Sequence, residues 1–302
     1  PNSIIILPVR AAASSPAGHR NGTGCEELLR RFVPFDTGCK PYHSRPMGAL
    51  EIVLLPCLAD NYCVLLHDHG SGQTAAIDAP HAATITAALN ERGWRLNHIF
   101  ITHHHTDHTA GIAELKRHYG ASVTGPGAEA ERIPDLTREV TASSSLEFAG
   151  HPIKVLETPG HTLGHITYYW PDDALAFTGD TLFSLGCGRI FEGDAETMWD
   201  SLSKIAALPG DTRIYCGHEY TLSNGRFALV VEPENEALEA RVAEVERLRA
   251  EGKPTLPTTI DQEKETNPFL RPQSRTIRAR LGLEGALDLE VFARLRQLKN
   301  KA

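Results

Sequence analysis

Short apolar runs alternate with turn residues along the chain from Leu50 onward. Such runs, bounded by Gly, Pro, Asn and Asp, predict strands, whereas apolar positions recurring every three or four residues predict helices. Strands are expected at residues 51–56, 61–67, 74–78, 98–102, 121–125, 151–160, 165–170, 174–180 and 212–217. Helices are expected at residues 82–92, 109–119 and 196–207. This interleaving predicts an α/β protein with two sheets covered by helices.

The pattern changes near both ends of the chain. After Glu219 the strand signal stops, and residues 235–250 predict an exposed amphipathic helix, followed by a proline-rich loop and further helical pieces. We therefore expect a sandwich domain at residues 49–218 and a small helical domain at residues 219–302. Residues 1–48 are rich in Ala, Ser, Gly, Pro and Arg without an apolar period, which predicts an irregular extension.

Composition excludes several classes of protein. The 302 residues carry a net charge of -8 without a basic run, so no nucleic-acid partner is expected. No apolar stretch approaches the roughly 20 residues that span a bilayer. The six cysteines lack CxxC spacing, which favours a reducing compartment. We expect a cytoplasmic monomer. The alternative location is an organelle, if the arginines of residues 1–48 belong to a transit peptide. The acidic residues Glu26, Glu27 and Asp36 argue against a transit peptide.

The sequence THHHTDH at residues 102–108 is the strongest chemical signal. The chain has fifteen histidines, and four of them lie between His103 and His108. In extended backbone, residues i and i+2 point the same way, so His103 and His105 can bind one ion while His104 points elsewhere. The chain then turns into a predicted helix, which leaves Asp107 and His108 to face a second ion.

Three other predicted strands end in a possible ligand. Because strand ends in α/β sheets line one crevice, these side chains are expected to meet the THHHTDH segment. The expected ligand sets are His103, His105 and His161 for one ion, Asp107, His108 and His218 for the other, and Asp180 bridging both. Imidazole and carboxylate ligands suit zinc, iron or manganese, and the absence of cysteine ligands indicates an open, catalytic site with two ions.

Single residues of these motifs also have simpler structural interpretations. An isolated histidine near a turn is usually a hydrogen-bonded surface or core residue, so neither TPGH nor GHEY would carry the assignment alone. His104 and His165 are expected to pack or to hydrogen-bond to ligands. Cys187 and Cys216 are expected to be buried small residues and not nucleophiles.

Several motifs together resemble a known family. THHHTDH, TPGHTLGH, FTGDTLF and CGHEY resemble the metallo-β-lactamase superfamily, and GCGRIFEG, CGHEYT and TNPFLR resemble the hydroxyacylglutathione hydrolase (glyoxalase II) family within it. The resemblance covers Leu50 to the C-terminus. It implies an αββα sandwich with a C-terminal helical domain, and hydrolysis of S-D-lactoylglutathione to D-lactate and glutathione, the second step of methylglyoxal detoxification.

The resemblance also implies a mechanism and a substrate site. A hydroxide between two divalent ions, zinc first and iron or manganese as alternatives, would attack the thioester carbonyl, with Asp107 and Asp180 as catalytic residues. The two carboxylates of glutathione call for cations. The candidate substrate contacts are Arg189, Tyr220, Arg271 and Arg275. Phe191 stands where relatives commonly have Tyr, so one hydroxyl contact to glutathione is expected to be missing.

Two other functions are compatible with parts of this sequence pattern. A persulfide dioxygenase of the same fold would use one iron and leave several of these ligands without a function. A metal-stabilised binding module would need a closed ligand shell. β-Lactam hydrolysis would need an antibiotic pocket, and RNA processing would need a basic arm. The sequence shows neither feature.

Overall fold

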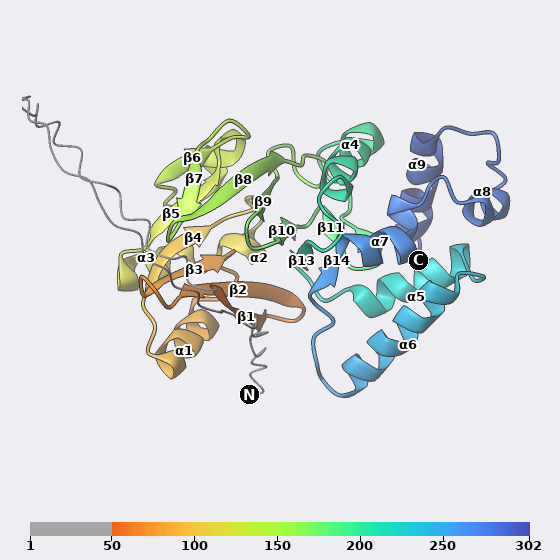
Figure 1. The fold of residues 1–302 in the computed structure, drawn as a ribbon. Coiled ribbons are helices and arrows are strands. Elements are labelled where there is room, and N and C mark those ends of the chain that lie inside the picture. The colour runs from red at the N-terminus through yellow and green to blue at the C-terminus, as the bar shows by residue number, and fades with distance from the viewer. Residues whose placement is uncertain (1–49) are drawn as a thin grey trace, which may run out of the picture.

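The computed structural model describes residues 50–302, so the expected extension at residues 1–48 lies outside the described residues. Two six-stranded sheets form the centre of the molecule (Figure 1). The first sheet has the order β1 (Leu50–Cys57), β2 (Asn61–Asp68), β3 (Gln73–Ile77), β4 (Leu96–Phe100), β5 (Ser122–Pro126) and β6 (Arg138–Val140). The second has the order β14 (Thr258–Thr259), β13 (Arg213–Cys216), β10 (Leu175–Gly179), β9 (Ile166–Trp170), β8 (His151–Glu157) and β7 (Leu146–Phe148). A hairpin of β11 (Leu182–Phe183) and β12 (Gly186–Cys187) follows β10.

Helices cover the outer face of each sheet. The first sheet packs on α1 (Ala82–Arg92) and α3 (Ile112–Tyr119), and the second on α4 (Ala195–Ala206). Between the sheets lies an aromatic core that includes Phe100, Tyr168, Trp170 and Phe177. The layers therefore run helix, sheet, sheet, helix, and the expected αββα sandwich is confirmed.

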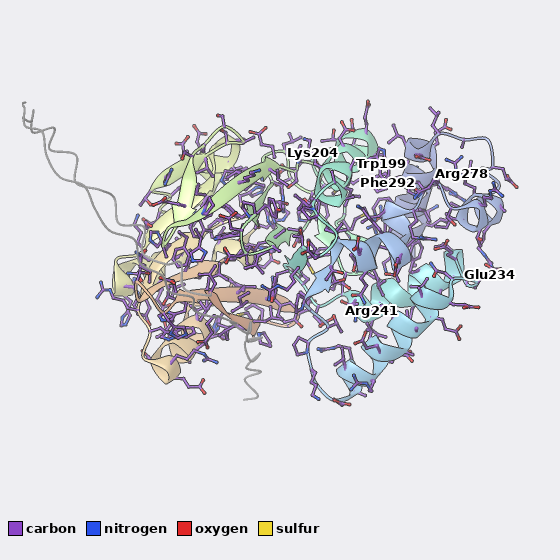
Figure 2. The ribbon with its side chains drawn as sticks, in the orientation of Figure 1. Trp199, Lys204, Glu234, Arg241, Arg278 and Phe292 are labelled. Carbon is purple, nitrogen blue, oxygen red and sulfur yellow. The ribbon has the colours of Figure 1, made fainter. Side chains whose placement is uncertain are left out.

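Residues after His218 form a helical region beside the second sheet (Figure 1). Its helices are α5 (Thr221–Val231), α6 (Glu236–Ala250), α7 (Ile260–Thr266), α8 (Arg275–Leu281) and α9 (Asp288–Lys299). The ring of Trp199 in α4 lies 5.6 Å from that of Phe292 in α9, and Figure 2 places the two side chains together. Because one apolar cluster joins Ile214, Met198 and Phe292, the helical region is packed firmly against the sandwich.

Two local expectations were wrong. In place of the helix expected at residues 109–119 there are two helices, α2 (Thr106–Thr109) and α3, because the amide of Gly111 donates to the carbonyl of Ala79 at 2.8 Å and not to the preceding helical turn. A strand, β14, occurs after Glu219, because two threonines pair with β13. A strand of only two residues is too short to show an apolar pattern in the sequence. No helix within residues 50–302 has the length and apolarity to cross a bilayer.

Candidate dinuclear metal centre

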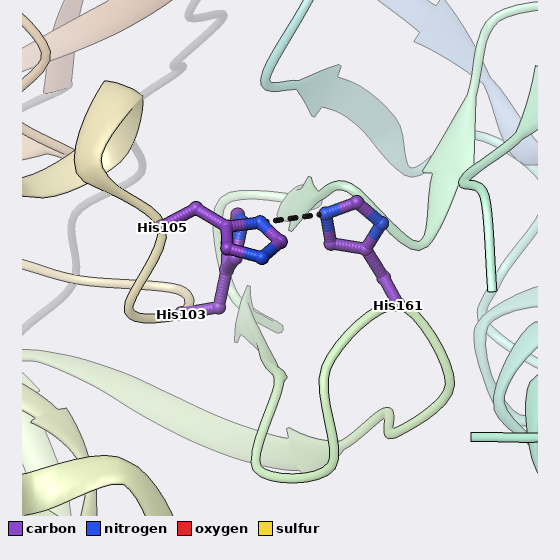
Figure 3. Close-up of side chains that lie close together, drawn as sticks. All are labelled: His103, His105 and His161. Carbon is purple, nitrogen blue, oxygen red and sulfur yellow. Dashed lines mark hydrogen bonds between the residues drawn. The ribbon is translucent and has the colours of Figure 1, made fainter. Parts of the chain in front are cut away.

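The seven expected ligands meet at the base of one cleft, where five line the cleft and His103 and His108 are buried beneath it. His103 and His105 follow β4, Asp107 and His108 lie in α2, and single ligands follow β8, β10 and β13. Figure 3 shows the first ligand set, with the imidazoles of His103, His105 and His161 turned toward one another. The cleft beside them has a volume of about 510 Å³. Strand ends that are more than a hundred residues apart thus deliver their side chains to one place.

The first ligand set, His103, His105 and His161, surrounds a single point. Nδ1 of His105 lies 3.0 Å from Nε2 of His103 and 3.0 Å from Nε2 of His161. Around a tetrahedral zinc ion with bonds of roughly 2.0–2.1 Å, ligand atoms are separated by roughly 3.4 Å. The three nitrogens therefore lie close to the spacing that one ion needs.

The second ligand set, Asp107, His108 and His218, has similar spacing. Nε2 of His218 is 3.2 Å from Nε2 of His108 and 3.4 Å from Oδ2 of Asp107. Asp180 lies between the sets, with Oδ2 3.3 Å from Nε2 of both His161 and His218. Its Oδ1 is buried without a hydrogen-bond partner among the described residues. A buried, unpaired carboxylate oxygen facing ring nitrogens fits a bridging metal ligand.

The charge states of these groups also suit metal binding. Burial alone would raise the pKa of Asp180, but His108 and His218 outweigh burial and hold that pKa well below its usual range. A hydrogen bond from His218 lowers the pKa of Asp107. Burial and the neighbouring imidazoles lower the pKa of His103 well below the usual value. Ionised carboxylates and a neutral imidazole are the forms that coordinate a cation.

His218 shows where positive charge is needed. Burial lowers its pKa, but Asp180, Asp107 and Asp60 outweigh burial and raise the pKa to about 11. Three carboxylates therefore converge on one imidazole. A divalent cation held at this place would neutralise the same carboxylates and would bind His218 as neutral imidazole.

Several residues that orient the ligands were not identified from the sequence. Oδ2 of Asp78 lies 2.8 Å from Nδ1 of His108, and the carbonyl oxygen of Arg189 lies 2.8 Å from Nδ1 of His161. Asp78 ends the strand TAAID, so the same strand-end signal that marked Asp180 could have found it. Neither His104 nor His165 belongs to a ligand set: Nδ1 of His104 bonds to Glu129, and Nε2 of His165 accepts from the backbone amide of Asp180.

The cleft wall contains two of the four expected substrate contacts. Arg189 and Tyr220 line the cleft, together with Phe191. The Tyr220 ring is stacked on that of His218 with a centroid distance of 4.8 Å. Phe191 is 61% exposed and its ring lies 5.2 Å from that of His161, so an apolar surface borders the first ligand set.

The structure does not bring Arg271 or Arg275 to the cleft. The guanidinium of Arg271 donates two hydrogen bonds of 2.9 Å to the buried carboxylate of Glu232, and Arg275 is exposed at the start of α8. Arg296 and Lys299 of α9 line the cleft instead. The spacing of these two cations, three residues apart and so on one face of a helix, is a signal that could have found them.

Family models match the chain in two consecutive parts. Residues 61–218 match the model described as "Metallo-beta-lactamase superfamily", and residues 219–302 match "Hydroxyacylglutathione hydrolase C-terminus". The hydroxyacylglutathione hydrolase of Rhizobium meliloti (strain 1021) is 56% identical over 254 residues, which are 84% of this chain and 99% of that relative. This chain belongs to the hydroxyacylglutathione hydrolase family. The hydroxyacylglutathione hydrolase of Brucella abortus (strain 2308) is 55% identical over 251 residues, 83% of this chain and 98% of that relative.

Solved structures share the sandwich of this hydroxyacylglutathione hydrolase family member. ETHE1 from Myxococcus xanthus has a TM-score of 0.58 and 26% identity, covering 82% of this chain and 89% of that one. The BLEG-1 B3 metallo-beta-lactamase has a TM-score of 0.55 and 22% identity, covering 73% and 99%. The second of these shows likeness of fold alone. Fold and family agree with the resemblance seen in the sequence, and the chain's clusters of His and Asp indicate binding of divalent metal.

Proposed function

We propose that this protein hydrolyses S-(2-hydroxyacyl)glutathione thioesters, converting S-D-lactoylglutathione to D-lactate and glutathione in methylglyoxal detoxification. One observation carries the proposal. Two adjacent ligand sets sharing Asp180 open into a cleft whose wall bears Arg189, Arg296 and Lys299, although the protein as a whole is acidic. A metal centre beside concentrated positive charge suits a substrate that joins a hydrolysable carbonyl to carboxylates.

The ligands described above would hold two ions, with zinc(II) proposed as native and iron or manganese as alternatives that the same donors accept. When bound, two divalent cations act as Lewis acids that lower the pKa of water and polarise a carbonyl oxygen. Asp107 and Asp180 are the catalytic carboxylates, because they face the shared centre. The departing glutathione thiolate needs no strong acid, since a thiol ordinarily has a pKa of about 8.5.

The cations of the cleft wall would bind the glutathione carboxylates. Arg189 is exposed at the cleft and free to form a bidentate pair with a carboxylate. Arg296 is buried and donates a 2.7 Å hydrogen bond to the carbonyl of Cys187, so it also holds the loop that leads to Arg189. Tyr220 offers a hydroxyl at the same wall. We therefore assign the role first expected of Arg271 and Arg275 to Arg296 and Lys299.

Lys299 is set to respond to substrate charge. Burial, reinforced by Arg296 and Arg189, lowers the pKa of Lys299 to about 8. Its ammonium donates to the carbonyl oxygen and hydroxyl of Ser223 at 3.0 and 3.1 Å. A substrate carboxylate arriving beside the three cations would stabilise the charged form of Lys299.

A dioxygenase reaction and attack by an enzyme thiol fit this site less well than metal-dependent thioester hydrolysis does. A dioxygenase of this fold is expected to use one iron, and the complete second ligand set argues against it. Attack by an enzyme thiol is disfavoured because burial raises the pKa of Cys187, the cysteine that lines the cleft.

The test is release of thiol from S-D-lactoylglutathione by zinc-loaded protein, with the metal content of the same sample measured in parallel. We expect turnover and two ions per chain. A metal-loaded sample that is inert toward the thioester would reject the proposal, and oxygen consumption with glutathione persulfide would select the dioxygenase.

We further propose that the protein acts as a cytoplasmic monomer, divided at residues 218/219 into a catalytic and a substrate-binding unit. We also propose that residues 1–46 are dispensable for activity. Light scattering would measure the mass of the particle. A chain beginning at residue 47 should retain full turnover, and a large loss would contradict this part of the proposal.

A further inference from the structure

The end of the β1–β2 turn and the first residue of β2 contact two members of the second ligand set. Oδ1 of Asp60 lies 2.9 Å from Nδ1 of His218. Nδ2 of Asn61 donates to Oδ2 of Asp107 at 3.0 Å and to the carbonyl oxygen of Asp107 at 3.1 Å. Two consecutive residues therefore hold ligands that lie more than a hundred positions apart in the sequence.

The backbone of this turn is fixed to the segment that carries His218. The amide of Glu219 donates to the carbonyl of Asp60, and the amide of Tyr62 donates to the carbonyl of Gly217, both at 2.8 Å. Asn61 and His218 also form an isolated β-bridge. Asn61 is 5% exposed, so its amide has little access to competing water. Side chains on a backbone held at so many points have few alternative positions.

The chemistry of each contact suits a ligand. A carboxylate that accepts from Nδ1–H of His218 selects the tautomer whose Nε2 carries a free lone pair toward the centre. The amide of Asn61 restrains both the backbone and the carboxylate of Asp107, which fixes the rotation of that carboxylate. Asparagine is suited to this position because its amide nitrogen donates, whereas an aspartate would place negative charge 3 Å from another carboxylate.

The first ligand set is oriented by different groups. Nδ1 of His161 faces the carbonyl of Arg189, and Nδ1 of His103 lies 3.0 Å from the hydroxyl of Thr102. Among residues 50–302, Asp60 and Asn61 make no hydrogen bond to the first set. The two sets therefore have separate supports although they share Asp180.

We propose that Asp60 and Asn61 are positioning residues that set the affinity of the second ion without setting that of the first. This inference rests on the proposed dinuclear centre. Loss of an outer hydrogen-bond partner of a metal ligand ordinarily weakens metal binding about 10- to 100-fold. We expect that loss for one ion only.

The experiment titrates zinc into metal-free protein against a chromophoric chelator and extracts two dissociation constants. The variants are Asp60→Ala, Asp60→Asn and Asn61→Asp. The matched control is Asp173→Asn, because Asp173 makes the same kind of bond, 2.8 Å to Nδ1 of the buried His151, away from the centre.

We expect one constant to rise about 10- to 100-fold in Asp60→Ala and Asn61→Asp, with the other within about threefold of wild type. Asp60→Asn should lie between, because an amide oxygen still accepts from His218. The control should leave both constants unchanged. In crystals of Asp60→Ala grown at limiting zinc, anomalous scattering should locate the retained ion at His103, His105 and His161.

Several results would overturn the inference: an equal rise in both constants, no rise in either, an equal effect of Asp173→Asn, or retention of the ion at the second set. Asp60→Asn and Asn61→Asp preserve side-chain shape, so they carry the test if Asp60→Ala does not fold. A wild-type protein that binds fewer than two ions would instead refute the proposed centre itself.

Discussion

Gly217 offers a steric test of the metal centre. It lies between β13 and His218 and is buried. A Cβ added there would lie 2.5 Å from Oδ1 of Asp180 and 2.6 Å from Cε1 of His108. Its φ lies outside the left-handed region, so the backbone accepts alanine without strain. The substitution Gly217→Ala therefore adds a methyl group that contacts two ligands and leaves the backbone conformation unchanged.

The size of the effect follows from these distances. Ordinary contact needs about 3.5 Å, so Asp180 and His108 must each move by roughly 1 Å. Metal–ligand distances tolerate only about 0.2 Å. Overpacking costs about 1–3 kcal/mol of folding stability, and a misplacement of about 1 Å in a catalytic group can reduce the rate about 100-fold. We expect loss of bound metal and at least that loss of thioester turnover.

The assay compares wild type, Gly217→Ala and the control Gly285→Ala for zinc content, thiol release and melting temperature. Gly285 is exposed, and a Cβ there meets no atom within 4 Å. The control should match wild type in all three measurements. If Gly217→Ala were folded, bound two ions and turned over at the wild-type rate, the geometry described for Asp180 and His108 would be wrong.

Three further predictions concern charge. Asp180→Asn keeps the side-chain shape but removes the charge shared by both ligand sets, so metal analysis should show weaker binding of both ions and kcat should fall at least about 100-fold. Lys299 is charged below its pKa of about 8 and neutral above it. KM for S-D-lactoylglutathione, measured across pH 6–10, should therefore rise as pH increases through 8. Lys299→Arg should move that rise to higher pH, because the guanidinium stays charged. Arg271→Ala leaves the buried carboxylate of Glu232 without its charged partner, so calorimetry should show a stability loss of about 1–3 kcal/mol while KM is unchanged. A raised KM with unchanged stability would return Arg271 to the substrate site.

The cluster of candidate metal ligands could be predicted because its signals are local. The alternation of His103 and His105 is a property of extended backbone, and His161, Asp180 and His218 each follow a recognisable strand. The cations that line the cleft could not be predicted in the same way. Arg271 lies in a motif that resembles the family, yet its guanidinium is occupied by Glu232, which lies 39 residues earlier.

Apolar and polar periodicity along the chain thus determined the two sheets, their covering helices and the donors available to bind metal. Tertiary structure decided which charges reach the cleft. Packing of Phe292 against Trp199 orients α9, and only that docking turns Arg296 and Lys299 toward the metal centre. Periodicity depends on neighbouring residues and is visible in the sequence, whereas the face that a helix presents to a distant segment depends on how their side chains fit together.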